Sequence, residues 1–366
     1  MAKDMHKIDF DEGTLLKLQI FEQYTTEWLP VFIHSGFKTI SIYDYFAGSG
    51  EDASGVPGSP LLILKSIEKY ALDIKSQRCQ IVLHFNEKIK SKLDTLQRLI
   101  EDELLKSSCS EYITVKYYNN DFNALFDLQY KKLRKESPAL ILIDQYGFKH
   151  LQQNNNFQKL LMLPKTDFLF FLSSSNIRRF ILSPELRNHF PDLDPNTTTS
   201  TQWVNIHRFM LDYYRAKIPD GNEFKLYPFT IKKGSNIYGL IFGSQSPKGV
   251  EKFLKVAWNK NKVNGEASFD IDNDYQKAIP TLFDNIEGFE RPLTKIEKFN
   301  NDLSEFILKS STLTNRDVYN FALDCGHIPQ LHAKEVLQKL KKEKKNQIFR
   351  KNWLNICLLF WKICQY

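Results

Sequence analysis

A glycine-rich segment follows the first apolar, strand-like run of the chain. It reads YDYFAGSGEDASGVPGSP over residues 43–60 and carries an acid, Asp44, ahead of Gly48 and Gly50. Glycine lets the backbone approach a ligand closely and adopt positive φ angles that a Cβ atom disfavours. At the carboxyl edge of a parallel sheet, such a loop lies where α/β folds bind nucleotides and related ligands. The pattern predicts a ligand-binding loop, followed by a helix with Ser59 as its cap and Pro60 in its first turn.

Polar residues end the next three strand-like runs as well. Glu87 follows the second run and Asp144 ends the fourth, while Asp121 and Phe122 follow the third. S-adenosylmethionine (SAM) fits this set. Glu87 can accept both ribose hydroxyls, Asp121 can bond the adenine amino group and Phe122 can cover the adenine ring. The predicted cofactor-binding residues are Asp44, Phe46, Ala47, Gly48, Gly50, Ser59, Glu87, Asp121 and Phe122.

The stretch ILIDQYGF (141–148) has the residue types of a methyl-transfer site. It resembles the D-P-P-Y motifs of amino-directed methyltransferases, in which an acid and a carbonyl accept hydrogens from the target nitrogen and an aromatic ring stacks on the substrate. Little acid–base chemistry is needed, because a sulfonium is an activated donor and catalysis is mostly alignment. The predicted catalytic residues are Asp144, Gln145 and Tyr146. The alternative is that Asp144 only caps the following helix.

A nicotinamide dinucleotide is the alternative cofactor, because GSGEDA (48–53) matches the G-x-G-x-x-A fingerprint. In that fingerprint the helix begins inside the motif and its N-terminus meets the pyrophosphate. Here Gly55, Pro57 and Gly58 forbid so early a helix. The next acid at a strand end, Glu87, also lies well beyond the ~20 residues expected of a ribose partner. SAM therefore fits better than NAD.

Apolar strands alternate with helices and place these residues in one sheet. The strand-like runs lie at 39–46, 80–85, 113–118, 139–144, 167–173, 225–232 and 236–243, and the last two read as a β-hairpin. The helical stretches lie at 14–29, 60–76, 87–106, 122–136, 150–162 and 248–260. Nearly continuous apolar strands joined by helices indicate a parallel sheet covered on both faces. Five such units and a terminal hairpin are the sheet plan of many class I methyltransferases, so we predict an α/β, Rossmann-like fold of that kind.

The C-terminal part changes character. Thr314 can cap a helix that Gly326 ends, and a second helix at 330–345 carries a row of lysines. Two helices joined by a short glycine-containing turn form a helix-turn-helix pattern, for which NQIFRKN (346–352) is a candidate wing. The basic helix predicts nucleic-acid contact, and the alternative is a helical docking domain with a solvated lysine face. The lysines concerned are Lys334, Lys339 and Lys342.

These elements predict three parts of the chain. Residues 1–245 form the Rossmann-like methyltransferase domain, 246–300 a helical linker with an irregular segment, and 301–366 the helix-turn-helix or winged-helix-like domain. A polar, Pro- and Thr-rich loop is expected at 191–202.

The composition is that of an ordinary globular chain with excess positive charge. Of 366 residues, 42% are hydrophobic and 25% charged, and the net charge of +7 favours an anionic partner. The five cysteines are scattered without a C-x-x-C pair, so neither a zinc site nor a disulfide framework is indicated. No run reaches the ~18 apolar residues of a membrane span, and the N-terminus lacks a signal-peptide core. We therefore expect a cytoplasmic protein without a metal.

Five segments resemble the three-Cys-motif partner proteins and occur in that family's order. They are KLQIFEQYTTEWLP (17–30), YDYFAGSGEDASGVPGSPLLIL (43–64), LIDQYGFKHL (142–151), IYGLIFGSQSPKGVEKFLKVAW (237–258) and TNRDVYNFALDCGHIPQLHAKEVLQKLKKE (314–343). The resemblance implies a fold similar to SAM-dependent methyltransferases. It also implies a three-Cys-motif protein, related to radical-SAM enzymes, as a partner, often in phage- and defence-associated contexts. The family usually has Gly-Pro-Gly at 48–50 and Asp-Pro-Phe-Gly at 144–147, where this chain has Gly-Ser-Gly and Asp-Gln-Tyr-Gly.

Two functions of different classes follow from these observations. The first is SAM-dependent methyl transfer to a nitrogen of a nucleic acid or of a substrate presented by a partner. The second is a non-catalytic subunit that keeps the fold and acts with the three-Cys-motif protein.

Overall fold

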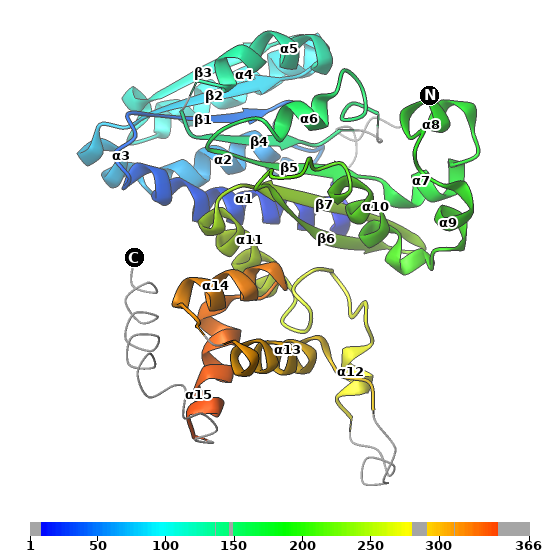
Figure 1. Ribbon diagram of the computed structural model, residues 1–366. Helices are drawn as coiled ribbons and strands as arrows, with labels where there is room; N and C mark the ends of the chain where they lie inside the picture. The colour runs from blue at the N-terminus through cyan, green and yellow to red at the C-terminus, as the bar shows by residue number, and fades with distance from the viewer. Residues whose placement is uncertain (1–8, 136, 146–148, 280–290, 311, 343–366) are drawn as a thin grey trace. The chain divides into compact units, whose positions relative to one another are not determined.

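The computed structural model describes residues 9–135, 137–145, 149–279, 291–310 and 312–342 (Figure 1). The chain divides into two compact units, Met1–Phe253 and Leu254–Tyr366. The boundary falls inside helix α11 (Pro247–Lys260), within the segment that the sequence assigns to a linker.

The first unit is built on one seven-stranded sheet with the order β3-β2-β1-β4-β5-β7-β6. Neighbouring strands among β1 to β5 pair in parallel, and β7 runs antiparallel to both β5 and β6. The strands are β1 (Thr39–Asp44), β2 (Gln80–Asn86), β3 (Ile113–Tyr118), β4 (Ala139–Ile143), β5 (Thr166–Leu172), β6 (Lys225–Lys233) and β7 (Asn236–Ser244). This order, with its terminal hairpin, is that of the class I methyltransferase sheet, and the predicted fold class is confirmed.

Helices cover both faces of this sheet (Figure 1). On one face α1 packs on α2, and α2 packs on α4. On the other face, side chains of α5, α6 and α10 join a core with inward residues of the strands, such as Ile141 and Phe170. The helices are α1 (Glu12–Ile33), α2 (Ser59–Glu68), α3 (Ala71–Gln77), α4 (Lys90–Lys106), α5 (Phe122–Leu133), α6 (Asn156–Leu160) and α10 (Ile206–Arg215). Because both faces are buried, the central strands must be apolar throughout, as all five residues of β4 are.

Three local predictions are wrong. The helix predicted at 60–76 is two helices, α2 and α3, and Tyr70 between them donates from its hydroxyl to the Thr26 carbonyl of α1. The helix predicted at 150–162 shrinks to α6, because Asn154 and Asn155 adopt positive φ angles that asparagine tolerates and helices exclude. The loop predicted at 191–202 contains helix α9 (Pro195–Ser200), which Asp194 caps ahead of Pro195.

Two short helices follow β5 in the chain. They are α7 (Ser174–Phe180) and α8 (Pro184–His189). Across all of the residues that the structure describes, no helix combines the length and apolarity that crossing a membrane requires.

Over its described residues, the named elements of the second unit are helices and helical turns. It contains α12 (Asp274–Lys277), α13 (Lys295–Lys309), α14 (Asn315–Asp324), a π-helical turn (Pro329–Ala333) and α15 (Lys334–Lys342). Thr314 and Asp317 form a reciprocal capping box at the start of α14, and Gly326 follows its end with a φ of 73°. Phe299, Leu303 and Val318 are among the residues that form its small core. The two helices and the turn of the predicted helix-turn-helix are therefore present, whereas the candidate wing at 346–352 lies outside the described residues.

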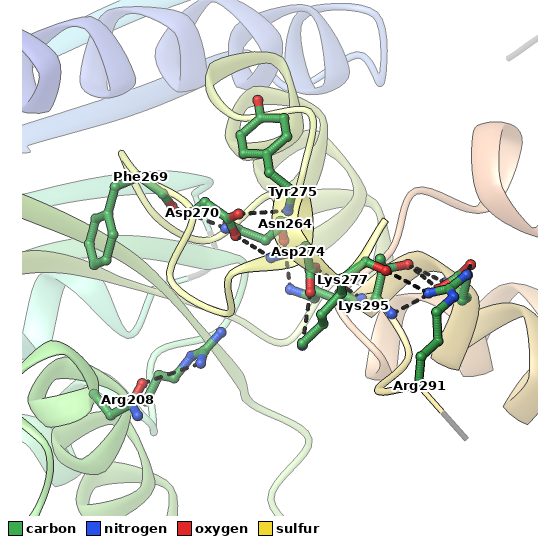
Figure 2. A network of polar contacts seen from close by, with 12 residues as sticks. Arg208, Asn264, Phe269, Asp270, Asp274, Tyr275, Lys277, Arg291 and Lys295 are labelled. Carbon is green, nitrogen blue, oxygen red and sulfur yellow. Dashed lines mark hydrogen bonds and ion pairs between the residues drawn. The ribbon is translucent and has the colours of Figure 1, made fainter. Parts of the chain in front are cut away.

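A polar network holds the segment before α13 (Figure 2). Asp270 accepts from the backbone N–H groups of Asp274 and Tyr275 at 2.9 and 2.8 Å. The Lys295 ammonium donates to the Asn264 carbonyl at 2.6 Å, and Asp274 accepts from the Lys295 backbone at 3.0 Å. The acids of this region therefore serve the fold, and the described residues contain no group of His, Cys, Asp and Glu arranged to hold a metal ion.

Candidate functional site

The glycine loop turns sharply at the carboxyl end of β1. Gly48 and Gly50 have φ angles of 66° and 94°, in the region that glycine favours. A Cβ atom on Gly50 would lie 3.0 Å from Cδ1 of Leu96 on α4. A Cβ atom on Gly58 would lie 3.0 Å from the Gly50 carbonyl oxygen, to which the Gly58 N–H donates at 2.7 Å. The loop is thus closed on itself by glycines.

A compact turn lies between the glycine loop and α2. Glu51 and Pro57 pair as an isolated antiparallel bridge, with the Asp52 carboxylate inside the turn. Asp52 accepts from the Val56 N–H at 2.8 Å and from the Phe10 N–H at 2.7 Å. The inserted turn delays the start of the helix, as the sequence predicts. The N-terminal segment holds this turn in place through the bond from Phe10 to Asp52.

Ser59 is not the helix cap that the sequence predicts. Gly58 is the N-cap residue of α2, and Ser59 is its first helical residue. The Ser59 hydroxyl donates instead to Oδ2 of Asp44 at 2.6 Å, and the Phe46 N–H donates to Oδ1 at 3.1 Å. Asp44 therefore fixes the loop.

Asp44 is buried, with 1% of its surface exposed. Burial raises its pKa to about 7, while the bonds from Ser59 and Phe46 oppose this rise. The nearby Asp144 charge raises the pKa further and the Lys17 charge lowers it, so these three ionisable groups sense one another.

A pocket of about 420 Å³ opens beside this loop. Four of the predicted site residues line it, namely Phe46, Glu87, Asp121 and Phe122. Its size falls in the range of small-molecule and cofactor sites. Ala47 is not among its lining residues; it is 3% exposed, and its N–H donates to the Asn86 carbonyl at 2.9 Å, which ties the loop to β2.

The two acids of this pocket keep distinct local contacts. Glu87 is half-buried, and its Oε1 accepts from the Ile89 N–H at 2.7 Å. Asp121 caps α5 through the Asn123 N–H at 3.0 Å and pairs with the Lys88 ammonium at 3.1 Å. The bond from Lys88 lowers the pKa of Asp121 the most, so this carboxylate is ionised at neutral pH.

Three aromatic rings form a wall of the pocket. The Phe46 and Phe122 rings stack with centroids 5.4 Å apart. The His150 ring lies 5.2 Å from Phe46 and 5.6 Å from Phe122. Burial lowers the pKa of His150, and none of the described residues hydrogen-bonds its buried Nδ1 atom. The pocket thus offers aromatic stacking surfaces, which fit a planar heterocycle such as adenine. No pattern in the sequence indicated that His150 would meet these rings.

A lysine that the sequence did not single out meets the predicted catalytic acid. The Lys17 Nζ atom of α1 lies 2.5 Å from Oδ2 of Asp144, at the end of β4. Lys17 is 7% exposed, and its ammonium also lies 4.8 Å from the centroid of the Phe171 ring. Helical periodicity could have indicated that Lys17 is buried. Lys17 precedes Phe21 by four residues and so lies on the buried stripe of the helix.

The other two predicted catalytic residues differ from Asp144. Gln145 is 1% exposed; its Nε2 donates to the Phe171 carbonyl at 3.3 Å and its Oε1 accepts from the His150 N–H at 3.1 Å. Both ends of its amide bond the backbone, so the side chain links Phe171 to His150 rather than facing a ligand. Tyr146 lies outside the described residues.

The basic helix α15 has the predicted two-sided character. Val336 and Leu337 are buried in the core of the second unit. Lys334, Lys339 and Lys342 are all exposed.

Comparison with known proteins gives a family match for the C-terminal part of the chain. Residues 270–352 match the family described as the GMT-like wHTH domain, which confirms the predicted C-terminal winged-helix-like domain. That match begins inside the segment 246–300 that the sequence assigns to a linker. No curated protein matches the sequence.

Among solved structures, the chain is similar to the DszA carbon methyltransferase at 14% identity and a TM-score of 0.33. The aligned part covers 59% of this chain and 51%, about half, of that chain. It is also similar to the methyltransferase domain of bacterial CtHen1-C at 13% identity and a TM-score of 0.32, covering 61% and 97% of the two chains. At such identities the similarity concerns the fold alone.

Proposed function

We propose that this chain is a SAM-dependent methyltransferase that acts on a nitrogen atom. The observation that supports this most is the pocket at the carboxyl edge of a methyltransferase-type sheet, lined by Phe46, Glu87, Asp121 and Phe122 beside a closed glycine loop. Ligands of open α/β sheets bind at this edge, where the strand order reverses between β1 and β4.

The residues of the site have separate roles in this proposal. SAM, when bound, supplies an activated methyl group on its sulfonium. Glu87 would hold the ribose hydroxyls, Asp121 the adenine amino group, and Phe122 one face of the adenine ring. Asp144 would accept a hydrogen bond from the target nitrogen and so orient its lone pair, because alignment is the main requirement of this reaction.

The substrate that fits best is a nucleic acid. The second unit matches a winged helix-turn-helix family, and α15 exposes Lys334, Lys339 and Lys342 on one side of a small apolar core. Lysines on such a helix bind phosphate groups in a salt-dependent manner.

A non-catalytic role is the second candidate. The resemblance to three-Cys-motif partner proteins, which are found in phage- and defence-associated contexts, points to a complex with a three-Cys-motif protein. Gln145 stands where that family usually has proline, and its amide is bonded within the protein. A chain that binds SAM but methylates neither nucleic acid nor the partner would support this candidate.

Calorimetric titration with SAM and its demethylated product tests the proposal. We expect micromolar binding that Glu87→Gln weakens about tenfold, since a hydrogen bond to a charged group is worth about 1.5–3 kcal/mol. Glu103→Gln, on the surface of α4, is the matched control and should bind as the native chain does. If neither ligand binds, the methyltransferase proposal is wrong.

A gel shift tests the nucleic-acid part. Lys339→Ala with Lys342→Ala should weaken binding and lower the slope of affinity against salt by roughly 0.9 for each phosphate that the variant no longer neutralises. Lys298→Ala, an exposed lysine of α13, is the control in the same unit. Equal slopes for all three proteins would assign the basic face of α15 to solvent or to protein docking.

A further inference from the structure

The ion pair between Lys17 and Asp144 lies at the methyl-donor end of the proposed site. Lys17 is 7% exposed, and the Asp144 side chain is 22% exposed. The Phe171 ring lies against the ammonium at 4.8 Å. A lysine so far removed from water requires an anionic partner, because an unpaired buried charge is strongly destabilising. In this structure Asp144 is that partner.

This pairing occupies one of the two acceptor oxygens of Asp144. Oδ2 lies 2.5 Å from the Lys17 ammonium, so Oδ1 is the oxygen left to accept a hydrogen of a target amine. Turning both oxygens toward substrate leaves Lys17 without a counter-charge unless another anion takes its place. A second anion beside Lys17 would therefore release the whole carboxylate for substrate.

The methionine end of SAM carries one anion, its α-carboxylate, and two cationic groups, its amino group and its sulfonium. The protein side holds the complementary charges. Asp44 and Asp144 are the acids, and Lys17 is close enough to both for its charge to act on them. The adenosine-sized pocket is lined by Phe46, whose backbone N–H bonds Asp44.

We propose that Lys17 is an ion-pair switch, which exchanges Asp144 for the α-carboxylate of SAM. The proposal rests on the function proposed above and deepens it. Cofactor binding moves the Lys17 ammonium from one carboxylate to another, so no buried charge is left unpaired. Both oxygens of Asp144 are then free to accept hydrogens of the target nitrogen. Substrate is thereby oriented by the whole carboxylate only after the methyl donor is present.

The test compares SAM with decarboxylated SAM, which keeps the adenosine, the sulfonium and the amino group but lacks the carboxylate. Titrations use the full chain and calorimetry. The native chain should prefer SAM. Lys17→Met should weaken SAM roughly 10- to 100-fold, the range expected for a hydrogen bond between charged groups, and leave decarboxylated SAM unchanged.

Asp144→Asn supplies the second, independent readout. It removes the carboxylate that competes for Lys17 and keeps the shape of the side chain, so SAM should bind as tightly as to the native chain or more tightly. A residue that merely held the site together would produce the opposite result. Weaker binding of SAM to this variant overturns the switch.

The remaining outcomes are separable. Equal weakening of both ligands by Lys17→Met shows that Lys17 only shapes the site, and unchanged SAM affinity shows that it does not bind the carboxylate. Either result overturns the switch and leaves the proposed function standing. If the native chain binds neither ligand, the proposed function fails, and the switch fails with it.

Discussion

Asp44→Asn should make the first unit more stable, and the gain should grow with pH. Asp44 is 1% exposed, and burial raises its pKa to about 7 from an ordinary 3.8. Between these values the folded chain binds a proton that the unfolded chain has lost. The contribution of Asp44 to stability is therefore fully present below pH 3.8 and is lost as pH rises through about 7.

The magnitude follows from the size of the shift. A difference of about three pKa units corresponds to about 4 kcal/mol of stability lost above pH 7. Asparagine keeps an oxygen for the Phe46 N–H, and its amide can donate to the Ser59 hydroxyl, so both contacts survive without the ionisation. The stability advantage of the variant over the native chain should therefore increase by roughly 2.5 kcal/mol from pH 5 to pH 8.

Hydrogen exchange of peptides from β1 measures this gain in the first unit by itself. Native and variant chains are compared at each pH, so that intrinsic exchange rates cancel. Asp102→Asn, an exposed acid of α4, controls for the removal of one surface carboxylate. A gain that is constant with pH, or one that grows toward acid, would show that Asp44 is not held as a buried carboxyl group whose ionisation opposes folding.

Two further predictions concern buried titratable groups. The Tyr24 hydroxyl donates to Oδ2 of Asp167 at 2.6 Å, and burial raises the pKa of Asp167 to about 6. Tyr24→Phe should lower the stability of the first unit by about 1–3 kcal/mol at pH 8 and by clearly less at pH 5, where Asp167 is protonated. Hydrogen exchange of β5 peptides measures this loss, and an equal loss at both pH values would contradict the prediction. In the second unit, burial lowers the pKa of His327 to about 2 and that of His332 to about 4. Because the unfolded chain takes up these protons first, each histidine should lower the stability of the unit by roughly 2 kcal/mol between pH 6.5 and pH 4.5. His327→Phe should remove its share, and an unchanged acid sensitivity in the exchange of α14 peptides would contradict this.

The strands could be predicted from sequence because each central strand is buried on both faces. Burial on both faces demands an uninterrupted apolar run, and the run alone identifies β4 without knowledge of its neighbours. The same holds for the site residues that follow strands directly. Glu87 and Asp121 lie at one edge because parallel strands end there, so chain position fixes spatial position.

The remaining features depend on contacts between distant segments. Lys17 and Asp144 are 127 residues apart, and a single lysine in a helix does not specify which acid it meets. The His150 N–H bonds the Gln145 side chain, and two asparagines with positive φ follow His150, where helical periodicity predicts a longer helix. Ser59 has the residue type of a helix cap, but a buried acid takes its hydroxyl instead. In each case a tertiary partner overrides a local preference.

The N-terminal helix should be counted as part of the candidate site rather than as a support for the sheet. The Phe10 N–H, just before α1, bonds Asp52 in the turn that delays α2, and Lys17, two turns later, pairs with Asp144 at the end of β4. One short segment thus fixes both the glycine loop and the predicted catalytic acid, which come from strands on either side of the point where the sheet order reverses. A sheet alone brings acids to its edge, and acids alone repel one another, as the influence of Asp144 on Asp44 shows. The cation that allows two carboxylates to lie together there has to come from another element, and α1 supplies it.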